Sequence, residues 1–175
     1  MSIPESFCTA RLRAERIEPR HFLDLVSFHR NAKVMAELGG IRDEEQTSLY
    51  LSRNLKHWEE YGFGVWMLQE LQADDVVGRV ILRHLLVGDI DEVEVGFALV
   101  PRLWGRGLAA EAAASCLRFA RLELNLESVV GVTTPNNQAS RRSLSRLGFL
   151  HESALTIDGT ACLLYRVRWE LNRQA

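Results

Sequence analysis

A glycine-rich turn leads directly into an alanine-rich helix at residues 104–112, which read WGRGLAAEA. The first backbone N–H groups of a helix lack intrahelical partners and lie at the positive end of its dipole. Gly105 and Gly107 have no Cβ atoms to keep phosphate oxygens away, and Arg106 between them adds a cation. The segment indicates either an anion site suited to phosphate or, as the plainer alternative, a tight turn with nothing bound.

A second segment, EVEVGFAL at residues 92–99, places carboxylates on a strand with open space beside them. Strand alternation puts Val93, Val95, Phe97 and Leu99 on one face, and Glu92, Glu94, Gly96 and Ala98 on the other. Two residues with almost no side chain follow Glu94 on its face, which leaves room for a ligand to lie against the strand. An exposed edge with small residues by chance is the alternative.

The distribution of charge favours a small anionic ligand over a polymer. The net charge of −2 and the 25% of charged residues are typical of a soluble globular protein, and they argue against nucleic acid or an anionic membrane as partner. The segment 102–146 nevertheless contains seven arginines and three glutamates, a net charge of +4, so the rest of the chain carries −6. The positive segment includes the glycine turn.

Neither a metal site nor a disulfide has support in the residue spacing. The histidines never fall at i, i+4 beside a carboxylate, so we expect no metal. Cys8, Cys116 and Cys162 are odd in number and far apart, with no secretory leader seen before them, which indicates a reducing cytoplasm. No apolar run approaches the ~18 residues that a membrane span needs.

In the first half of the chain we expect an edge strand around Thr9–Glu15 and a helix after Pro19. A second helix begins at Asp43, which forms a capping box with Gln46, and Gly62 ends it. The stretches 63–70 and 76–84 are rich in β-formers and lie close enough to form an antiparallel hairpin.

In the second half, a helix is expected from about Leu108 to Asn125, with small apolar residues along one stripe. The buried strand 129–134 follows, and this order implies a parallel crossover. Asn136 or Asn137 caps the next helix, and an Asp158-Gly159 turn leads into a last strand that alternates from Leu163 to Leu171. No linker or repeat interrupts residues 1–175, so we expect a single domain.

Residues 105–110 also satisfy the loose dinucleotide pattern G-x-G-x-x-A. That pattern belongs to the first βα turn of a parallel α/β array, whereas here about 90 residues of mainly antiparallel character come first. We therefore disfavour a dehydrogenase.

Four motifs in order together resemble the GNAT acyl-CoA-dependent N-acetyltransferases, in particular the subgroup of ribosomal-protein N-terminal acetyltransferases. They are TARLRAE near the start, EVGFAL, WGRGLAAEA, and NNQASRRSLSRLGF near the end. The similarity covers nearly the whole chain, and Trp104 stands where the family loop commonly has Gln or Arg. The resemblance implies an α+β fold: a mixed, mostly antiparallel sheet of about seven strands flanked by helices, with a V-shaped splay between the fourth and fifth strands.

The resemblance also implies acetyl-CoA as co-substrate and places it in the V. The pantetheine amides would pair along Phe97, Ala98 and Leu99, and the pyrophosphate would lie on the backbone of Trp104, Gly105, Arg106, Gly107, Leu108 and Ala109. Asn137 would contact the pantetheine arm, and Arg142 or Arg146 would reach the 3′-phosphate unless they are simply solvated.

Transfer from a thioester to an amine needs the amine to lose a proton. Glu94 on the open face is the expected base, acting directly or through a water, with Glu92 in reserve; an ordinary ion pair with Arg83 is the competing interpretation. An α-amine, with a pKa of ~8, needs less help than a lysine at ~10.

The thiolate leaving group also needs a proton or stabilisation. Many GNAT enzymes have a tyrosine seven residues after the motif asparagine, but this position is Leu144 here. Ser140 is the subgroup-like substitute, and its hydroxyl can hydrogen-bond the thiolate; alternatively it bonds its own i−4 carbonyl.

The amine acceptor stays open between a protein N-terminus and a small molecule such as a polyamine or an aminoglycoside. A GNAT module that binds acyl-CoA without turnover is the alternative function. A homodimer, common among relatives, also stays open.

Overall fold

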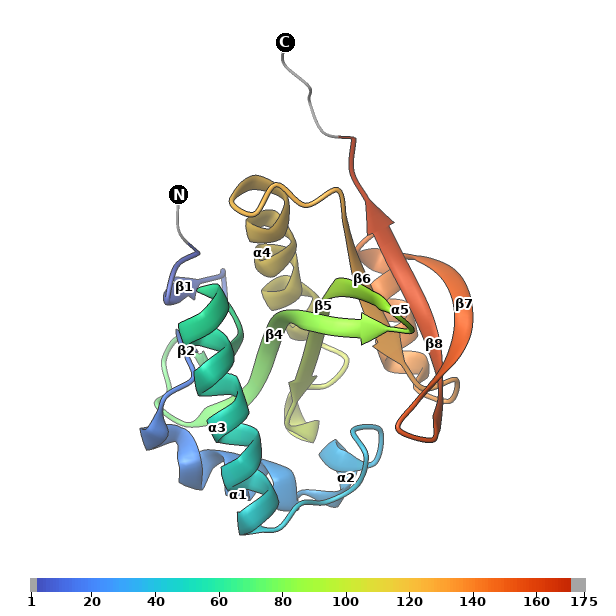
Figure 1. Ribbon diagram of the computed structural model, residues 1–175. Coiled ribbons are helices and arrows are strands. Elements are labelled where there is room, and N and C mark those ends of the chain that lie inside the picture. The colour runs from blue at the N-terminus through green and yellow to red at the C-terminus, as the bar shows by residue number, and fades with distance from the viewer. Residues whose placement is uncertain (1–2, 171–175) are drawn as a thin grey trace.

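The computed structural model describes residues 3–170, which form one mixed eight-stranded sheet with helices on both faces (Figure 1). The strands are β1 (Ser6–Cys8), β2 (Leu12–Arg16), β3 (Val65–Glu70), β4 (Val76–Val87), β5 (Ile90–Leu99), β6 (Ser128–Thr133), β7 (Leu150–Ile157) and β8 (Thr160–Arg168). Their order across the sheet is β1-β2-β3-β4-β5-β6-β8-β7. Neighbours are antiparallel except β5 and β6, which run parallel. The expected fold class is confirmed.

One detail of the expected sheet is wrong. The strand expected at the edge is β2, and it lies inside the sheet because β1 pairs with its outer side. β1 has three residues, too few for a pattern, so the sheet has eight strands instead of about seven. The splay consequently lies between β5 and β6 in this numbering.

The helices are α1 (Phe22–Arg30), α2 (Ala32–Met35), α3 (Glu44–Tyr61), α4 (Leu108–Leu122) and α5 (Gln138–Arg146), with short 3-10 turns at Pro19–His21 and Pro101–Leu103. Asp43 caps α3 and exchanges hydrogen bonds with Gln46, and Gly62 ends the helix in the left-handed conformation, as expected. Leu171 of the expected last strand lies outside the described residues, and β8 ends at Arg168. Among residues 3–170, no helix is long and apolar enough to cross a membrane.

Different helices cover the two faces of the sheet. α4 covers the face that carries Val95 and Leu99, and its small residues Ala112 and Ala113 are fully buried there. α1 and α2 cover the opposite face, where Phe28, Val34 and Met35 form a cluster that packs against Ala98. Burial of both faces fixes the alternation of β5, because a slip of one residue would turn its valines away from α4.

Candidate active site

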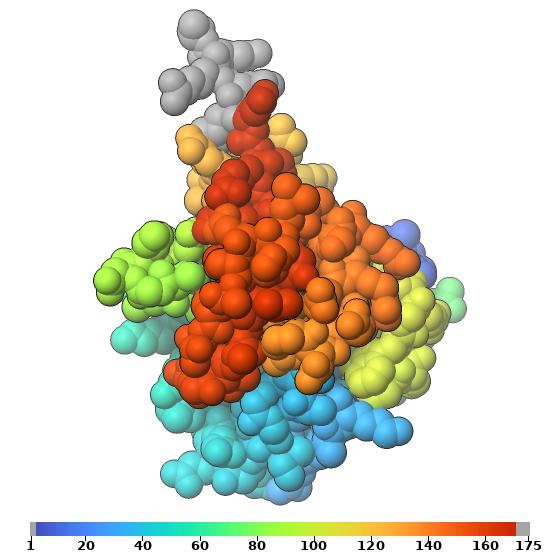
Figure 2. Space-filling view, turned by 90° about the vertical axis from the view of Figure 1, so that its right-hand side faces the viewer, coloured from blue at the N-terminus to red at the C-terminus, as the bar shows by residue number. Residues whose placement is uncertain are grey.

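A cleft of about 700 Å³ opens where the end of β5 meets the N-terminus of α4. One wall comes from α2 and the residues after it, and another from the start of α5. In Figure 2 the segment around residues 33–40 lies directly beneath residues 135–146, with the 100–110 loop beside them. Thr134 donates a hydrogen bond to Glu37 and so joins β6 to the α2 wall.

Most residues that the sequence indicated line this cleft. They are Phe97, Ala98, Leu99, Trp104, Gly105, Gly107, Leu108, Ala109, Asn137, Ser140, Arg142 and Arg146. Glu94, the reserve base Glu92 and Arg106 do not line it. Segments that are 40 residues apart in sequence are therefore brought together around one elongated hollow.

The cleft exists because β5 and β6 separate. Their one registered pair is Glu94 with Val130, and between there and the C-terminal end of β5 the described structure has no further pair with β6. Residues 96–99 stay paired with β4 on their other side. Backbone groups left open at such a split are strong hydrogen-bonding groups, so the split offers a strand-like surface to an extended ligand.

The turn before α4 presents backbone N–H groups to the cleft. Gly105 and Gly107 have φ of +74° and +76°, in the left-handed region that favours glycine. Gly107 is the N-cap of α4 and carries no side-chain cap. No described residue accepts a hydrogen bond from the N–H groups of residues 105–110. These free donors at a helix N-terminus suit an anion.

Contacts from distant segments hold this turn in place. The Trp104 indole donates from Nε1 to the Leu99 carbonyl oxygen at 2.7 Å, which ties the turn to the end of β5. Arg11 donates from Nη1 to the Arg106 carbonyl at 3.0 Å and pairs through Nη2 with Glu111 at 2.6 Å. Arg11 could not be identified from the sequence, because no local pattern links the start of β2 to α4. The one signal for a basic partner was Glu111, the acidic residue in the first turn of α4.

Glu111 anchors that contact electrostatically. Thr9 donates to Glu111 Oε1 at 2.5 Å, and the Arg11 backbone N–H donates to the same oxygen at 2.9 Å. Burial raises the pKa of the Glu111 carboxyl, but the hydrogen bonds from Thr9 and Arg11 outweigh it and leave the pKa below its usual range. The carboxylate thus stays ionised and holds the β1–β2 turn against α4.

Arg106 faces away from the cleft. Its Nη1 lies 3.5 Å from Glu70 Oε1, and Arg102 Nη1 donates to the other Glu70 oxygen at 2.6 Å. The Arg106 backbone is part of the turn before α4, residues 104–107, which we call the anion turn. Its guanidinium belongs to a surface ion pair.

Asn137 caps α5 and sets the position of the residues that follow it. Its Oδ1 accepts from the Ser140 N–H at 3.0 Å, which leaves the Nδ2 group available to the cleft. The i−4 back-bond in this helix is made by Ser143 to Ala139 and by no other described serine of α5, so the Ser140 hydroxyl is not used in that way. Its position on the cleft wall is compatible with a ligand.

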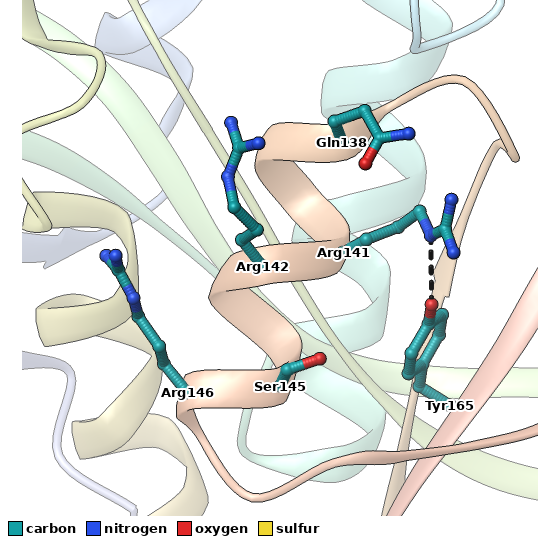
Figure 3. Close-up of a pocket in the computed structure, with 6 residues that line it drawn as sticks. All are labelled: Gln138, Arg141, Arg142, Ser145, Arg146 and Tyr165. Carbon is teal, nitrogen blue, oxygen red and sulfur yellow. Dashed lines mark hydrogen bonds between the residues drawn. The ribbon is translucent and has the colours of Figure 1, made fainter.

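Two exposed arginines of α5 extend to the same side of the helix. In Figure 3, Arg142 and Arg146 point together toward α4, whereas Arg141 turns the other way to Tyr165. Arg141 donates from Nε to the Tyr165 hydroxyl at 3.1 Å. Arg142 and Arg146 therefore border the cleft with charges that no carboxylate of the described chain neutralises.

Both candidate bases are ion-paired. Arg83 donates from Nε to Glu94 Oε2 at 2.9 Å, and Glu94 is 8% exposed. Glu92 receives two hydrogen bonds from Arg166, at 2.7 and 2.9 Å. Glu94 keeps Oε1 free of hydrogen bonds from the described residues, whereas both oxygens of Glu92 are occupied.

The family model described as "Acetyltransferase (GNAT) domain" matches residues 11–150. The chain belongs to the GNAT acetyltransferase family. It is therefore an acyltransferase of the acetyl-CoA-dependent N-acetyltransferase class. The matched range includes β5 and β6, which separate at the split, and every residue that lines the cleft.

Relatives of this GNAT acetyltransferase span much of its length. The uncharacterised Bacillus subtilis protein YkkB is 24% identical over 156 residues, which are 89% of this chain and 91% of YkkB. The Aspergillus fumigatus FsC-acetyl coenzyme A-N(2)-transacetylase is 33% identical over 96 residues, 51% of this chain and 40% of the fungal enzyme.

Solved structures share the fold. An acetyltransferase from Agrobacterium tumefaciens superposes with a TM-score of 0.82 at 26% identity, covering 97% of this chain and 96% of that one. RimL, a ribosomal-protein α-N-acetyltransferase in complex with coenzyme A, has a TM-score of 0.75 at 14% identity, covering 96% and 98%. At that identity the likeness to RimL shows the fold alone.

The site of this GNAT acetyltransferase fits coenzyme A. The cofactor combines a pyrophosphate with an extended arm that carries two amides. The free N–H groups at residues 105–110 match the first, and the unpaired side of residues 97–99 matches the second. When bound, the co-substrate supplies an acetyl group activated as a thioester.

Proposed function

We propose that this protein moves the acetyl group of acetyl-CoA directly onto a primary amine while both substrates are bound. The observation that carries this is the cleft at the split between β5 and β6, lined by a bare anion turn at one end. The fungal relative is an acetyl coenzyme A-N(2)-transacetylase, which supports an amine as acceptor. The acceptor classes that the sequence leaves open are the α-amine of a protein N-terminus and a small-molecule amine.

In this proposal Trp104, Gly105, Gly107, Leu108 and Ala109 hold the pyrophosphate through main-chain groups. Phe97, Ala98 and Leu99 pair with the pantetheine arm, and Asn137 supports it from α5. Arg142 and Arg146 face the 3′-phosphate. The backbone N–H groups of the turn are in place before the ligand binds. They would therefore fix the positions of the phosphates and, through them, of the thioester.

Glu94 receives the proton of the attacking amine. The neutral nitrogen then attacks the thioester carbonyl, a C–N bond forms, the C–S bond breaks to release the thiolate, and the second surplus proton of the nitrogen passes to that thiolate. Glu94 suits the first step because it lies at the apex of the split with Oε1 unoccupied. Arg83 holds the carboxylate in place through the other oxygen.

Ser140 stabilises the thiolate through its hydroxyl. A thiolate is a tolerable leaving group, so a hydrogen bond suffices where the family tyrosine is replaced by Leu144. No acyl-cysteine is needed: Cys116 is fully buried, and burial raises the pKa of its thiol. Burial also raises the pKa of the Cys162 thiol. The attack is therefore direct.

The alternative is a module that binds acyl-CoA without turnover. One observation favours it: each candidate base already pairs with an arginine, Glu94 with Arg83 and Glu92 with Arg166. A carboxylate held in this way serves the fold even when no proton moves.

Thiol release from acetyl-CoA, followed against a panel of peptides and small amines, tests the proposal. We expect Glu94→Gln to lower kcat/KM by about 100-fold or more, because a positioned base contributes about that factor. Glu59→Gln, at an exposed position of α3, is the matched control and should behave as the wild type. Tight CoA binding without thiol release for any amine would favour the alternative.

A further inference from the structure

Three arginines converge on the face of the sheet from which Glu94 projects. Arg79 and Arg83 of β4 pair in register with Ala98 and Glu94 of β5, so all four side chains share that face. Arg42, in the segment between α2 and α3, reaches the same place. Among the described residues, Glu94 is the one carboxylate that acts on Arg79 and Arg83.

Arg79 is enclosed without a counter-charge. It is 4% exposed, and its guanidinium carbon lies 4.6 Å from the centre of the Tyr50 ring and 5.5 Å from that of Phe28. Its Nη1 donates to His29 Nε2 at 2.8 Å. His29 is neutral, since burial and the neighbouring Arg79 lower the pKa of its imidazole to about 3. Two aromatic rings and a neutral imidazole thus surround the cation.

Donors in the same cluster lack acceptors. The Tyr50 hydroxyl and the Arg79 Nε are buried and have no hydrogen-bond partner among the described residues. The guanidinium carbon of Arg42 lies 5.2 Å from the centre of the Tyr50 ring, and Arg42 donates from Nη2 to the Leu38 carbonyl oxygen at 3.4 Å. Buried donors without partners are rare in folded proteins and indicate a missing acceptor.

The cluster borders the cleft. Leu38, whose carbonyl Arg42 contacts, lines it, and so does Ala98, the register partner of Arg79. The Arg83 side chain is 38% exposed although it pairs with Glu94, so a ligand can reach it. A small molecule at the apex of the split would therefore meet cations and a carboxylate side by side.

We propose that the amine acceptor also carries a carboxylate, as a free amino acid does, and that Arg42 and Arg83 bind this carboxylate with the Tyr50 hydroxyl donating to it. Arg79 acts as a positioning residue, which holds Tyr50 and adds positive charge behind the ligand. The inference rests on the proposed acetyl transfer and names its substrate class. It accounts for the surplus of cations, the unpartnered donors and their position beside Glu94.

The Glu94–Arg83 ion pair gives this recognition a catalytic consequence. A zwitterionic amino acid can insert between the two groups, with its carboxylate on Arg83 and its ammonium on Glu94. Arg83 then releases Glu94 Oε2, and both carboxylate oxygens face the ammonium. The proton passes from the ammonium to Glu94 before attack, so binding of the carboxylate prepares the base.

Matched acceptors test the proposal. Thiol release is measured for a series of free amino acids and their C-terminal amides, with an N-terminal peptide panel alongside. The amides lose the ammonium proton more readily, so intrinsic reactivity favours them. We expect the free acids to have a kcat/KM about 10-fold to 100-fold higher, because a charge-assisted hydrogen bond has that effect on binding. Equal use of acid and amide, or a preference for peptides without a nearby carboxylate, would overturn it.

Two variants separate recognition from folding. Tyr50→Phe removes a hydroxyl that makes no hydrogen bond among the described residues, so the free energy of unfolding should not fall, while KM for the acid rises about 3-fold to 10-fold. Arg42→Met should shrink the preference for acid over amide to within about 3-fold. Arg53→Met, at an exposed position of α3, removes the same charge and should keep the preference. A preference that survives both Tyr50→Phe and Arg42→Met would overturn the assignment.

Binding measurements separate this inference from the proposed function. Calorimetry of the CoA-loaded protein with N-acetyl amino acids and with their amides needs no turnover. If no amine is acetylated, acetyl transfer is wrong, yet tighter binding of the N-acetyl acids that Arg42→Met abolishes would still support the anion site. Equal binding of acid and amide forms would refute it independently of catalysis.

Discussion

The Trp104 indole N–H donates to the Leu99 carbonyl oxygen at 2.7 Å and so joins the anion turn to the last residue of β5. The indole is 52% exposed, so its contribution comes less from burial than from this tether. The proposed pyrophosphate and pantetheine sites are on the two segments that it joins. Their relative position therefore depends in part on a hydrogen bond that an aromatic ring alone cannot make.

Trp104→Phe tests this tether. The ring is kept but the donor is lost, so we expect KM for acetyl-CoA to rise about 5-fold with kcat within about 2-fold, since a neutral hydrogen bond is worth about 1 kcal/mol. Steady-state kinetics with acetyl-CoA varied would measure it. An unchanged KM would show that the turn is positioned without the indole.

Gly107→Ala probes the bare main chain of the turn. A Cβ at φ +76° costs about 1 kcal/mol of folding free energy, would lie 3.8 Å from Arg11 Nη2, and adds bulk to the main chain proposed to hold the phosphates. Gly159→Ala, at φ +77° in the β7–β8 turn with nothing within 4 Å, carries the same backbone cost away from the cleft. Both variants should unfold more easily in urea by a similar amount, but only Gly107→Ala should raise KM for acetyl-CoA, by about 10-fold. Equal effects of the two variants on KM would contradict the anion turn.

Ser140→Ala addresses the leaving group. If the hydroxyl stabilises the thiolate, kcat should fall about 10-fold while KM for acetyl-CoA stays the same, because the interaction arises mainly in the transition state. Ser145→Ala on the same helix is the control, since Ser145 is exposed and does not line the cleft. If both variants keep the wild-type kcat, no role for Ser140 remains.

The sequence predicted the parts of this site that depend on local conformation. The glycines at 105 and 107 and the cap at Asn137 act through backbone geometry, which residue type controls directly. Residue type alone does not decide whether an aromatic side chain enters the core: Trp58 and Trp66 are buried there, whereas Tyr61 is exposed.

The sequence indicated the pairing of Arg83 with Glu94 but not the rest of the arginine cluster. The position of Arg79 beside this pair could also have been derived from the sequence. The two-residue turn Gly88-Asp89 fixes the register of the β4–β5 hairpin and hence the pairing of Arg83 with Glu94 and Arg79 with Ala98. Arg42 reaches the cluster through packing of α1 and α3, which no local pattern specifies. Side chains that meet only through tertiary packing leave no periodic signal.

His29 makes the stability of this cluster depend on pH. Arginine can only donate, so His29 Nε2 accepts from Arg79, and the proton is on Nδ1, which donates to Thr47 Oγ1 at 3.0 Å. Protonation of Nε2 would remove the acceptor and place a second cation beside Arg79. Burial, with Arg79, accordingly lowers the pKa of His29 from 6.5 to about 3 in the folded protein.

The direction of the pH effect follows from proton counting. Between pH 6.5 and about 3 the unfolded chain binds the His29 proton and the folded chain does not, so stability falls as the pH is lowered through this window. The full effect is on the order of 5 kcal/mol of unfolding free energy. His29→Gln keeps an acceptor for Arg79 but cannot titrate. Urea unfolding at several pH values should therefore give a shallower slope for the variant, and identical slopes would show that His29 takes up its proton without unfolding the cluster.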